Sequence, residues 1–456
     1  MKTQYECTEC HKIVKKWVGL CPDCGEYSSF KEVITASFDI PTDGLKTAAK
    51  PPSTAAKSIS KANTKVERMP TGIGELDRVL GGGFVHSGVA LLGGEPGAGK
   101  STLSLKIANV FAKAGEKVLY ASGEESVSQI SIRAARMGID DDRILLVHTS
   151  SLEEILGHIE AEKPALFIVD SLQAVASSAL SGTLGSIQQS REAANVLNQT
   201  AKSTGSRAVL ISQITKGGEF AGPEAIQHVV DVLLLLEGAR DSPLKFLRTL
   251  KNRAGSTDEV GLFQHTDDGL EEVTDPSGIL SDGDADSLAP GVAYTVTSEG
   301  LRSLPVELQA LVTESSLPNP RKQFSGIPND RCQIICAVLD KYCKARLFEY
   351  DVFASSIFGV RINDPVSDLA IAAAILSSRY DYTSSDKTAY IGELSLTGQV
   401  RGHQRLRQKV MAAAASGFTK IVVPKSGLKD LKLNEIKSNV VGIRTITELK
   451  GIIQGS

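Results

Sequence analysis

The chain has 456 residues, of which 41% are hydrophobic and 23% are charged, and its net charge at pH 7 is −3. This length predicts two or three domains, and the composition is that of a soluble globular protein. The charge excludes a strong global attraction to nucleic acid, and the lack of an apolar leader or of about 18 consecutive apolar residues predicts a cytoplasmic protein with no membrane partner.

Residues 1–30 are expected to form a four-Cys zinc finger. The four thiolates that tetrahedral Zn²⁺ takes would come from two C-x-x-C pairs, Cys7, Cys10, Cys21 and Cys24. About 30 residues cannot bury a self-sufficient core, so metal binding would supply the folding free energy. Thioredoxin-type redox chemistry is the alternative, but no βαβ pattern surrounds either pair.

Residues 31–66 are expected to be a flexible linker. They contain three prolines, many small or polar residues and one aromatic residue, Phe38. Five lysines between Lys46 and Lys65 can touch nucleic acid, although a solvated tether is the simpler interpretation.

Residues 67–280 alternate short apolar strands with helical stretches, which predicts a mostly parallel sheet with crossover helices. We expect strands at 118–121, 144–147, 166–170, 208–212 and 229–236. We expect helices at 126–137 and 187–202.

A complete G-x-x-x-x-G-K-S phosphate loop lies between an apolar strand at 89–92 and a helical pattern at 102–114. The loop and the first residue after it are Gly94, Glu95, Pro96, Gly97, Ala98, Gly99, Lys100, Ser101 and Thr102. The glycines let backbone N–H groups face a phosphate, Lys100 can reach the β- and γ-phosphates, and the Ser101 hydroxyl can bind Mg²⁺. A glycine-rich turn without a ligand leaves Lys100 and Ser101 unexplained, so the sequence predicts that ATP and Mg²⁺ bind here.

Carboxylates follow two of the expected strands. Asp170 ends an apolar strand 70 residues after Lys100, which is a position for holding the Mg²⁺ shell. Glu124 follows the first strand after the loop and is the expected base for the attacking water, with Glu125 as its substitute. The alternative is an acidic cluster that only stabilises a helix N-terminus.

Three further features are candidates for coupling the nucleotide site to nucleic acid or to a neighbouring subunit. Gln213 ends a strand and can sense the γ-phosphate, and in the glycine-rich stretch that follows, Lys216 and Phe220 can contact single-stranded nucleic acid, unless this is a plain surface loop. Lys251 and Arg253 lie one residue apart at the end of the strand expected at 246–250, so they point the same way. They can act as fingers on a neighbouring subunit's nucleotide, and an ordinary surface pair is the alternative.

Residues 281–456 begin at an Asp-, Gly- and Ser-rich junction and contain an expected strand at 291–297 and expected helices at 368–377 and 406–415. Cys332, Cys336 and Cys343 lie in an apolar helical stretch, so we expect them in the core rather than on a metal.

The order of these motifs resembles the bacterial RadA/Sms family of DNA-repair proteins over essentially the full length. The resemblance includes Thr71–Asp77 ahead of the phosphate loop and a Lys-Asn-Arg-x-Gly motif at 251–255. It implies an α/β fold with an N-terminal zinc ribbon, a RecA-like phosphate-loop ATPase core and a C-terminal Lon-protease-like domain. The family has Phe in the fourth position of the motif, where this chain has Ala254, which places the coupling of that motif in question.

The resemblance also implies partners. It implies a homo-oligomer in the form of a hexameric ring, similar to the replicative helicase DnaB. It further implies ATP-driven movement on single-stranded DNA and branch migration of recombination intermediates with the RecA recombinase.

The resemblance also implies that the C-terminal domain has a protease-like fold without protease activity. The nucleophile position of Lon-type proteases falls on Val366, and the Lys base position falls on Arg407, which stays protonated at neutral pH. Ser367 is one residue away from the nucleophile position. As a scaffold, the domain has basic residues that can guide DNA or can simply be solvated, namely Arg321, Lys322, Arg401, Arg405 and Arg407.

Two other functions remain open. A RecA-fold signalling ATPase or autokinase shares the Glu124-Glu125 doublet, but it does not need a zinc finger or a Lon-like tail. An ATP-dependent protease is opposed by Val366 and Arg407.

Overall fold

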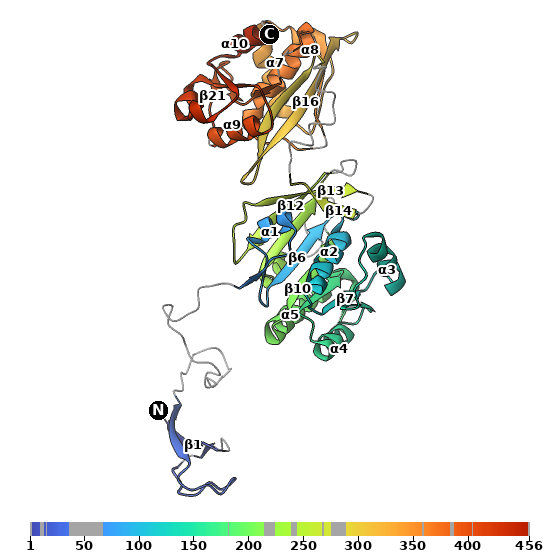
Figure 1. Cartoon of the computed structure of the whole chain (residues 1–456), viewed down its shortest axis with the longest axis vertical. Coiled ribbons are helices and arrows are strands. Elements are labelled where there is room, and N and C mark those ends of the chain that lie inside the picture. Colours follow the sequence, from blue (N-terminus) through green and yellow to red (C-terminus); the bar gives the residue numbers. More distant parts are fainter. Residues whose placement is uncertain are drawn as a thin grey trace. The chain divides into compact units, whose positions relative to one another are not determined.

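A computed structural model describes the chain in two compact units, Met1–Lys65 and Val66–Ser456 (Figure 1). The described residues are 2–9, 13–14, 16–35, 67–180, 182–213, 224–238, 244–266, 269–274, 289–357, 360–383, 387–403 and 405–454. None of the helices in these ranges is long and apolar enough to cross a membrane.

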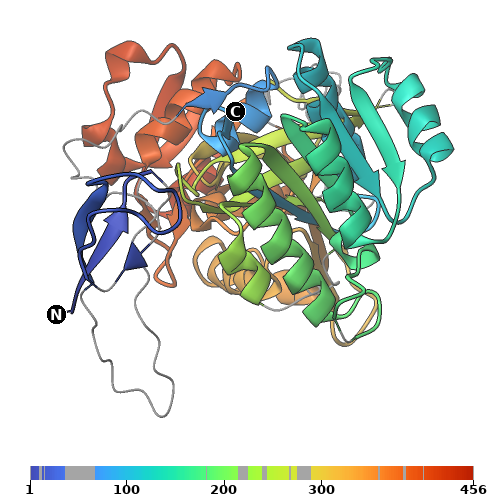
Figure 2. The same ribbon diagram turned by 90° about the horizontal axis from the view of Figure 1, so that it is seen from below.

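The first unit contains a three-stranded antiparallel ribbon, seen in dark blue in Figure 2. Its strands are β1 (Lys2–Cys7), β2 (Ile13–Val14) and β3 (Phe30–Thr35). Cys7, Cys21 and Phe30 are its buried centre. A core of this size cannot hold a fold alone, which is consistent with a metal-dependent ribbon. Strand β3 continues five residues past the boundary expected at residue 30.

A nine-stranded sheet forms the centre of the region that follows the ribbon and the expected linker, in the order β14-β13-β12-β11-β6-β10-β9-β7-β8. Its strands are β6 (Val89–Gly94), β7 (Val118–Ser122), β8 (Ile144–His148), β9 (Leu166–Asp170), β10 (Arg207–Gln213), β11 (Val232–Glu237), β12 (Leu244–Asn252), β13 (Val260–Thr266) and β14 (Gly269–Glu272). The six strands from β11 to β8 in this order are parallel, and β12, β13 and β14 extend the sheet antiparallel. A two-stranded sheet, β4 (Arg68–Met69) with β5 (Phe84–Val85), accompanies it.

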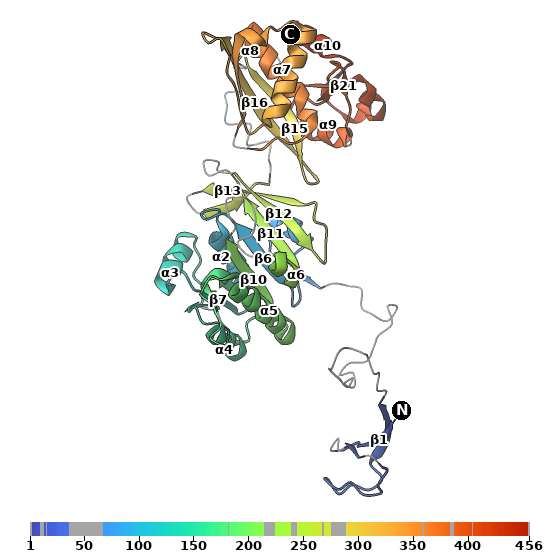
Figure 3. The ribbon, with the colours of Figure 1, turned by 180° about the vertical axis from the view of Figure 1, so that it is seen from behind.

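Helices cover both faces of the parallel strands. They are α1 (Gly74–Leu80), α2 (Lys100–Lys113), α3 (Val127–Arg136), α4 (Leu152–Glu162), α5 (Ile187–Thr204) and α6 (Glu224–Val229). Alternate strand residues enter opposite cores, so Ala90 and Leu92 pack with α1, α2 and α3, whereas Val89 and Leu91 pack with α4, α5 and α6. Figure 1 shows the face of the sheet with α1 and α2, and Figure 3, seen from behind, shows the face with α5 and α6.

Serine caps explain where three of these helices begin. Ser126, Ser151 and Ser186 each accept a hydrogen bond from a backbone N–H of the first turn, at the starts of α3, α4 and α5. The strand expected at 229–236 starts too early, because Val229 ends α6 and the strand begins at Val232. An unbroken apolar run does not distinguish the end of a short buried helix from the start of a strand.

The C-terminal region has a seven-stranded sheet in the order β17-β18-β16-β15-β19-β22-β23. Its strands are β15 (Val292–Glu299), β16 (Arg302–Glu314), β17 (Lys322–Ser325), β18 (Tyr350–Ser356), β19 (Thr388–Tyr390), β22 (Lys420–Pro424) and β23 (Asn439–Ile443). Short strands β20 (Glu393–Leu394) and β21 (Val400–Arg401) pair with each other. The helices are α7 (Asn329–Cys343), α8 (Asp368–Tyr380), α9 (Leu406–Ala415) and α10 (Ile446–Gln454).

The C-terminal sheet also separates two cores. Ala293 packs in the core that contains α7, α8 and α10, and Val296 packs in the core that contains α9. The three cysteines of α7 are buried as expected, and burial raises the pKa of the Cys332 thiol to about 12.

Candidate nucleotide and metal sites

Four adjacent parallel strands bring the predicted ATPase residues to one edge of the sheet. The phosphate loop follows β6, Gln213 ends β10, Asp170 ends β9 and Glu124 follows β7. The register pairs Gln213 with Gly94 and Asp170 with Ser122. The carboxyl ends of parallel strands are the usual place for ligands in α/β folds, because the connecting loops meet there.

The phosphate loop curls around the side chain of Lys100. The Lys100 Nζ donates hydrogen bonds to the carbonyl oxygens of Gly94 at 2.7 Å and Glu95 at 2.9 Å. Gly97 and Gly99 have φ of 80° and 102°, a backbone conformation that favours glycine. Burial lowers the pKa of Lys100, although the charges of Asp170 and Glu124 oppose this shift. The loop therefore holds a cation beside two carboxylates.

Asp170 is buried and oriented by two hydroxyl groups. The Tyr120 hydroxyl donates to Asp170 Oδ2 at 2.8 Å, and the Ser101 side chain forms a second hydrogen bond with the carboxylate. Burial raises the pKa of Asp170, and these two hydrogen bonds oppose the rise. Ser101 and Asp170 supply oxygen donors side by side, and this is the ligand chemistry that Mg²⁺ prefers.

Glu124 and Glu125 have different surroundings. Glu124 Oε1 accepts hydrogen bonds from Ser171 Oγ at 2.5 Å and from Gln213 Nε2 at 3.3 Å. Glu125 forms a two-point ion pair with Arg133 of α3, with N–O distances of 2.5 and 2.7 Å. This arrangement favours Glu124 as the water-activating residue, because Glu125 is already engaged.

Sequence reasoning missed Tyr120, Ser171 and Arg133. Tyr120 had a detectable signal, because a tyrosine inside an apolar strand needs a buried hydrogen-bond partner, and the neighbouring strand ends in an aspartate. Ser171 gave no comparable signal, since its role depends on which side chains the sheet brings together, and the pairing of Arg133 with Glu125, eight residues before it, depends on how α3 turns after β7.

Lys251 and Arg253 point the same way, toward the end of α6. Lys251 Nζ donates to the carbonyl oxygens of Gln227 at 2.6 Å and Val230 at 2.8 Å. Arg253 donates to the carbonyl of His228 at 3.0 Å and pairs with Asp231 at 3.2 Å. In the single chain both cations therefore cap a helix C-terminus, where positive charge is favourable. Lys216 and Phe220 lie outside the described residues.

Ala254 borders a small pocket of about 280 Å³. Apolar side chains of Leu80, Phe84 and Val232 line it together with Arg253. The small Ala254 side chain leaves space at the position where the related family has a phenylalanine.

Three cysteines of the ribbon converge. The sulfur atoms of Cys7, Cys21 and Cys24 lie within 4.8 Å of one another, and Cys10 lies outside the described residues. Zn–S bonds of about 2.3 Å in a tetrahedron place the sulfurs roughly 3.8 Å apart. The Cys7 and Cys24 sulfurs are 3.6 Å apart, so these thiols fit a zinc ion. Gly25, with φ of 71°, forms the turn after the second pair.

The C-terminal region contains the positions that correspond to the nucleophile and the base of Lon-type proteases. Val366 and Ser367 are fully buried, and the Ser367 hydroxyl has no hydrogen-bond partner among the described residues. Arg407 pairs on the surface with Glu435 at 2.7 Å. The buried cation is instead Lys409, which pairs with Asp364 and donates to Ser298 Oγ at 2.5 Å. The described side chains thus offer no exposed Ser–Lys dyad at these positions.

The basic residues of the same region lie on separate elements. Arg321 precedes β17 at one edge of the sheet, and Lys322 begins that strand. Arg401 ends β21, whereas Arg405 and Arg407 lie at the start of α9. All of them except the half-buried Lys322 are exposed.

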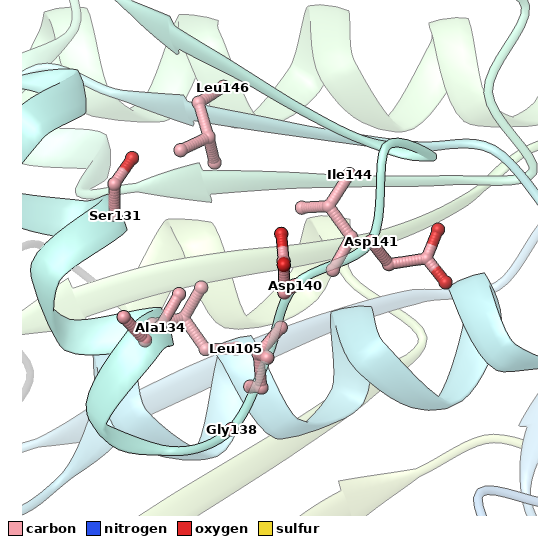
Figure 4. A pocket seen from close by; sticks show the side chains of 10 residues that line it. Leu105, Ser131, Ala134, Gly138, Asp140, Asp141, Ile144 and Leu146 are labelled. Atoms are coloured by element: carbon pink, nitrogen blue, oxygen red, sulfur yellow. The ribbon is translucent and has the colours of Figure 1, made fainter.

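An open pocket of about 600 Å³ lies between α2, α3 and β8 (Figure 4). Leu105, Ala134, Ile144 and Leu146 supply its apolar lining, and Asp140 lies among the labelled side chains. None of the site residues expected from the sequence lines it.

Comparisons with known proteins agree with this arrangement. The family profile described as KaiC, an ATPase family, matches residues 69–146, that of the rubredoxin metal binding domain matches residues 5–32, and that of subunit ChlI of Mg-chelatase matches residues 359–427. The chain is similar to proteins named DNA repair protein RadA. It is 40% identical to that of Mycolicibacterium smegmatis (98% of both chains), 39% to that of Mycobacterium tuberculosis (93% of this chain, 88% of the relative) and 37% to that of Streptococcus pyogenes (98% of both). The expected zinc ribbon, RecA-like core and Lon-like domain are confirmed.

Proposed function

Because the chain belongs to the RadA family of DNA repair proteins, we propose that it is an ATP-driven motor that binds single-stranded DNA and drives branch migration of recombination intermediates with RecA. The coarser part of this statement, a RecA-like ATPase of a DNA-repair family, is given by the relatives and the KaiC profile. The rest depends on the chemistry of the described residues.

The geometry at the sheet edge supports the following roles. Lys100 would exchange its bonds to the loop carbonyls for bonds to the β- and γ-phosphates. Ser101 and Asp170 would hold Mg²⁺, which neutralises phosphate charge when it is bound. Glu124 would take the proton of the attacking water, and Ser171 keeps this carboxylate in position.

The single observation that carries the motor function is the hydrogen bond between Gln213 and Glu124. It joins the water-activating carboxylate to the residue that directly precedes the glycine-rich stretch with Lys216 and Phe220. A γ-phosphate that draws either side chain toward itself would therefore also act on the start of that stretch, so DNA binding there would respond to the nucleotide.

The subunit arrangement of this motor is a ring, which we propose is hexameric. Lys251 and Arg253 would reach a neighbouring subunit's nucleotide and stabilise charge in the transition state. Arg401, Arg405 and Arg407, with Arg321 and Lys322, would guide DNA along the C-terminal domain, which serves as an inactive scaffold.

The deciding experiment is ATP hydrolysis by the purified full chain with and without a single-stranded oligonucleotide. We expect DNA to raise turnover several-fold, with affinity that falls steeply with salt, by a logarithmic slope of about 0.7 for each phosphate contact. A rate of ATP hydrolysis that stays the same when DNA is added at a saturating concentration would refute the motor function.

A signalling ATPase is the second candidate, because the KaiC profile covers the phosphate loop and Glu124. It predicts self-phosphorylation, which can be followed with labelled ATP in the same reactions. Phosphate transfer to the chain itself, without stimulation by DNA, would favour this function over the motor.

A further inference from the structure

A histidine of the antiparallel sheet extension contacts the phosphate loop. His265 lies near the end of β13, and its side chain points to the same face of the sheet as that of Phe263, which packs in the core with α2. A Cβ placed on Gly99 would lie 3.2 Å from both Cε1 and Nε2 of the His265 ring. Gly99 has φ of 102° and directly precedes α2. The ring therefore lies against the turn that carries the loop into the helix.

The His265 ring is a hydrogen-bond donor to this loop. Burial, together with the charge of Lys245, lowers the pKa of His265, so the ring is neutral at neutral pH and has one N–H group. Hydrogen bonds with the backbone of Ala98 and Gly97 oppose this shift. Because they favour the protonated ring, the ring N–H donates and the loop carbonyl oxygens accept. Nε2 is the ring nitrogen nearer to the Gly99 turn, so we assign the proton to it.

This contact fixes the direction of one peptide group. The C=O and N–H of a trans peptide point in opposite directions. The Ala98 carbonyl faces the His265 ring, so the N–H of the same peptide group, which belongs to Gly99, points away from β13. The Gly99 N–H has no hydrogen-bond partner within the part of the chain that the structure describes, whereas the Ala98 N–H donates to the Glu95 carbonyl at 3.1 Å. An N–H group without a partner at this bend is what a phosphate loop offers to an anion.

We propose that His265 is a positioning residue of the nucleotide site, whose ring holds the Ala98–Gly99 peptide so that the Gly99 N–H faces a bound phosphate. His265 acts through the loop and does not need to touch the nucleotide. The ligand is a nucleoside di- or triphosphate, because the contact that His265 prepares is to phosphate oxygens. This inference rests on the proposed ATPase function, and it adds a residue from a strand that the phosphate-loop motif does not include.

Binding of ATP and of inorganic tripolyphosphate to the full chain tests this role, because the second probe has phosphates but no nucleoside. We expect His265→Leu, which has no side-chain N–H, to weaken both by a similar factor of about 2- to 13-fold, as a net 0.5–1.5 kcal/mol for one hydrogen bond implies. His265→Gln should bind as the wild type does, because its amide N–H replaces the Nε2 donor. His158→Leu is the matched control, because it changes a half-buried histidine of α4 on the other face of the sheet.

Kinetics separate positioning from a general loss of structure. The Gly99 N–H would bind phosphate in the ground state and in the transition state, so we expect His265→Leu to raise KM and to leave kcat nearly unchanged. The melting temperature of the nucleotide-free protein verifies that each variant is folded. If His265→Leu does not fold, His265→Gln and His265→Asn are compared instead, and the shorter amide of His265→Asn should bind more weakly because it does not reach the loop.

The outcomes are distinct. If the wild type does not bind ATP, the proposed function itself fails. If the wild type binds ATP and folded His265→Leu binds it equally well, the function stands and the positioning role is refuted. The role is also refuted if His265→Gln binds as weakly as His265→Leu or His265→Asn, because the N–H donor then makes no difference. A loss of affinity for ATP but not for tripolyphosphate would mean that His265 contacts the nucleoside instead of the loop.

Discussion

Lys100 shows how the loop can present a positive charge before a phosphate arrives. Its ammonium group is held by two carbonyl oxygens of its own loop, and the carboxylates of Asp170 and Glu124 lie close enough to raise its pKa against the effect of burial. The ammonium group is therefore held inside the loop, and a phosphate that binds there would replace the two carbonyl oxygens as its partner.

We expect Lys100→Ala to lower ATP turnover by on the order of 10²- to 10³-fold or more, because the transition-state charge loses its fixed cation. Single-turnover and steady-state hydrolysis assays measure this. Lys113→Ala, at the exposed end of the same helix, is the control and should hydrolyse normally. Normal turnover by folded Lys100→Ala protein would mean that the nucleotide site lies elsewhere.

The two neighbouring glutamates should behave differently. Glu124→Gln is expected to lower kcat on the order of 10²- to 10⁴-fold while nucleotide binding persists, because general-base catalysis is lost. Glu125→Gln should keep most of its turnover but lower the melting temperature, because Arg133 loses its partner. Kinetics and nucleotide titrations on both variants test this, and the reverse order of effects would assign catalysis to Glu125.

Lys409 and Asp364 form a buried pair whose loss should affect folding. Burial disfavours the Asp364 carboxylate, but the hydrogen bond and charge of Lys409, with the N–H groups of Val366 and Ser298, lower its pKa overall. Lys409→Met leaves this carboxylate unpaired, so we expect a loss of about 3–5 kcal/mol in the unfolding free energy of its domain. Denaturant unfolding measures this, with Arg407→Met on the same helix as the exposed control.

The sign of the pH dependence follows from the direction of this shift. Because the folded pKa of Asp364 is lowered, its contribution to stability is complete above the unfolded pKa of about 3.9 and is lost as the pH falls through the folded pKa. The wild type should therefore lose stability relative to Asp364→Asn on acidification below about pH 4. A difference that stays constant down to the lowest measurable pH would contradict the assigned direction.

At the scale of elements, the end of β12 determines where the finger residues point. Lys251 pairs with Leu233 of β11 and Thr249 pairs with Leu234, so Leu250 is the extra residue of a β-bulge. A bulge redirects the strand locally, and here it precedes the two cations. The sequence predicts that Lys251 and Arg253 share a direction, but the helix end that they face appears only in the folded chain.

Lys251→Ala and Arg253→Ala should bind nucleotide about as well as the wild type but hydrolyse it slowly, since their charges are expected to act across a subunit boundary. Mixing either variant with Lys100→Ala protein should restore part of the activity at mixed interfaces. Lys202→Ala, which removes another cation close to Asp231, is the control. Verified mixed assemblies that recover no turnover would place the role of these residues within one subunit.

Elements could be predicted best where one signal dominates. The helix at 406–415 has the bounds that its pattern indicates, and the strands at 118–121 and 144–147 each continue for one more residue. Motif residues of the candidate nucleotide site could be proposed from the sequence because phosphate chemistry requires these residue types at a fixed spacing. Ser171 and the Lys409–Asp364 pair could not, because they are defined by contacts between segments distant in sequence, and Arg133 could not, because its pairing with Glu125 depends on how α3 turns after β7.

At the scale of the whole molecule, the division at residues 65 and 66 separates a small ribbon with three converging cysteines from a unit with large cores. The ribbon core contains Cys7, Cys21 and Phe30, whereas the ATPase sheet is buried on both faces. Loss of the metal should therefore unfold the ribbon and leave the rest intact.

We expect one zinc per chain, removed by a strong chelator together with the ribbon structure, while ATP hydrolysis without DNA continues. Metal analysis and thermal unfolding before and after chelation test this, and Cys332→Ser is a control because this thiol belongs to the core of α7. Absence of zinc from the wild type, or collapse of the ATPase on chelation, would contradict the assignment.

The capping of α6 by Lys251 and Arg253 sets up a competition. The same two side chains cannot satisfy the carbonyl oxygens of Gln227, His228 and Val230 and also neutralise a neighbour's phosphate. If they act in trans, each nucleotide that recruits them releases the end of α6, and α6 begins where the segment after Gln213 ends. By thermodynamic reciprocity, a ligand that binds that segment and favours the contacts of the two cations with α6 would then lower the affinity of the neighbouring subunit for its nucleotide. Competition at this one helix end would thus allow adjacent subunits to hydrolyse ATP one after another.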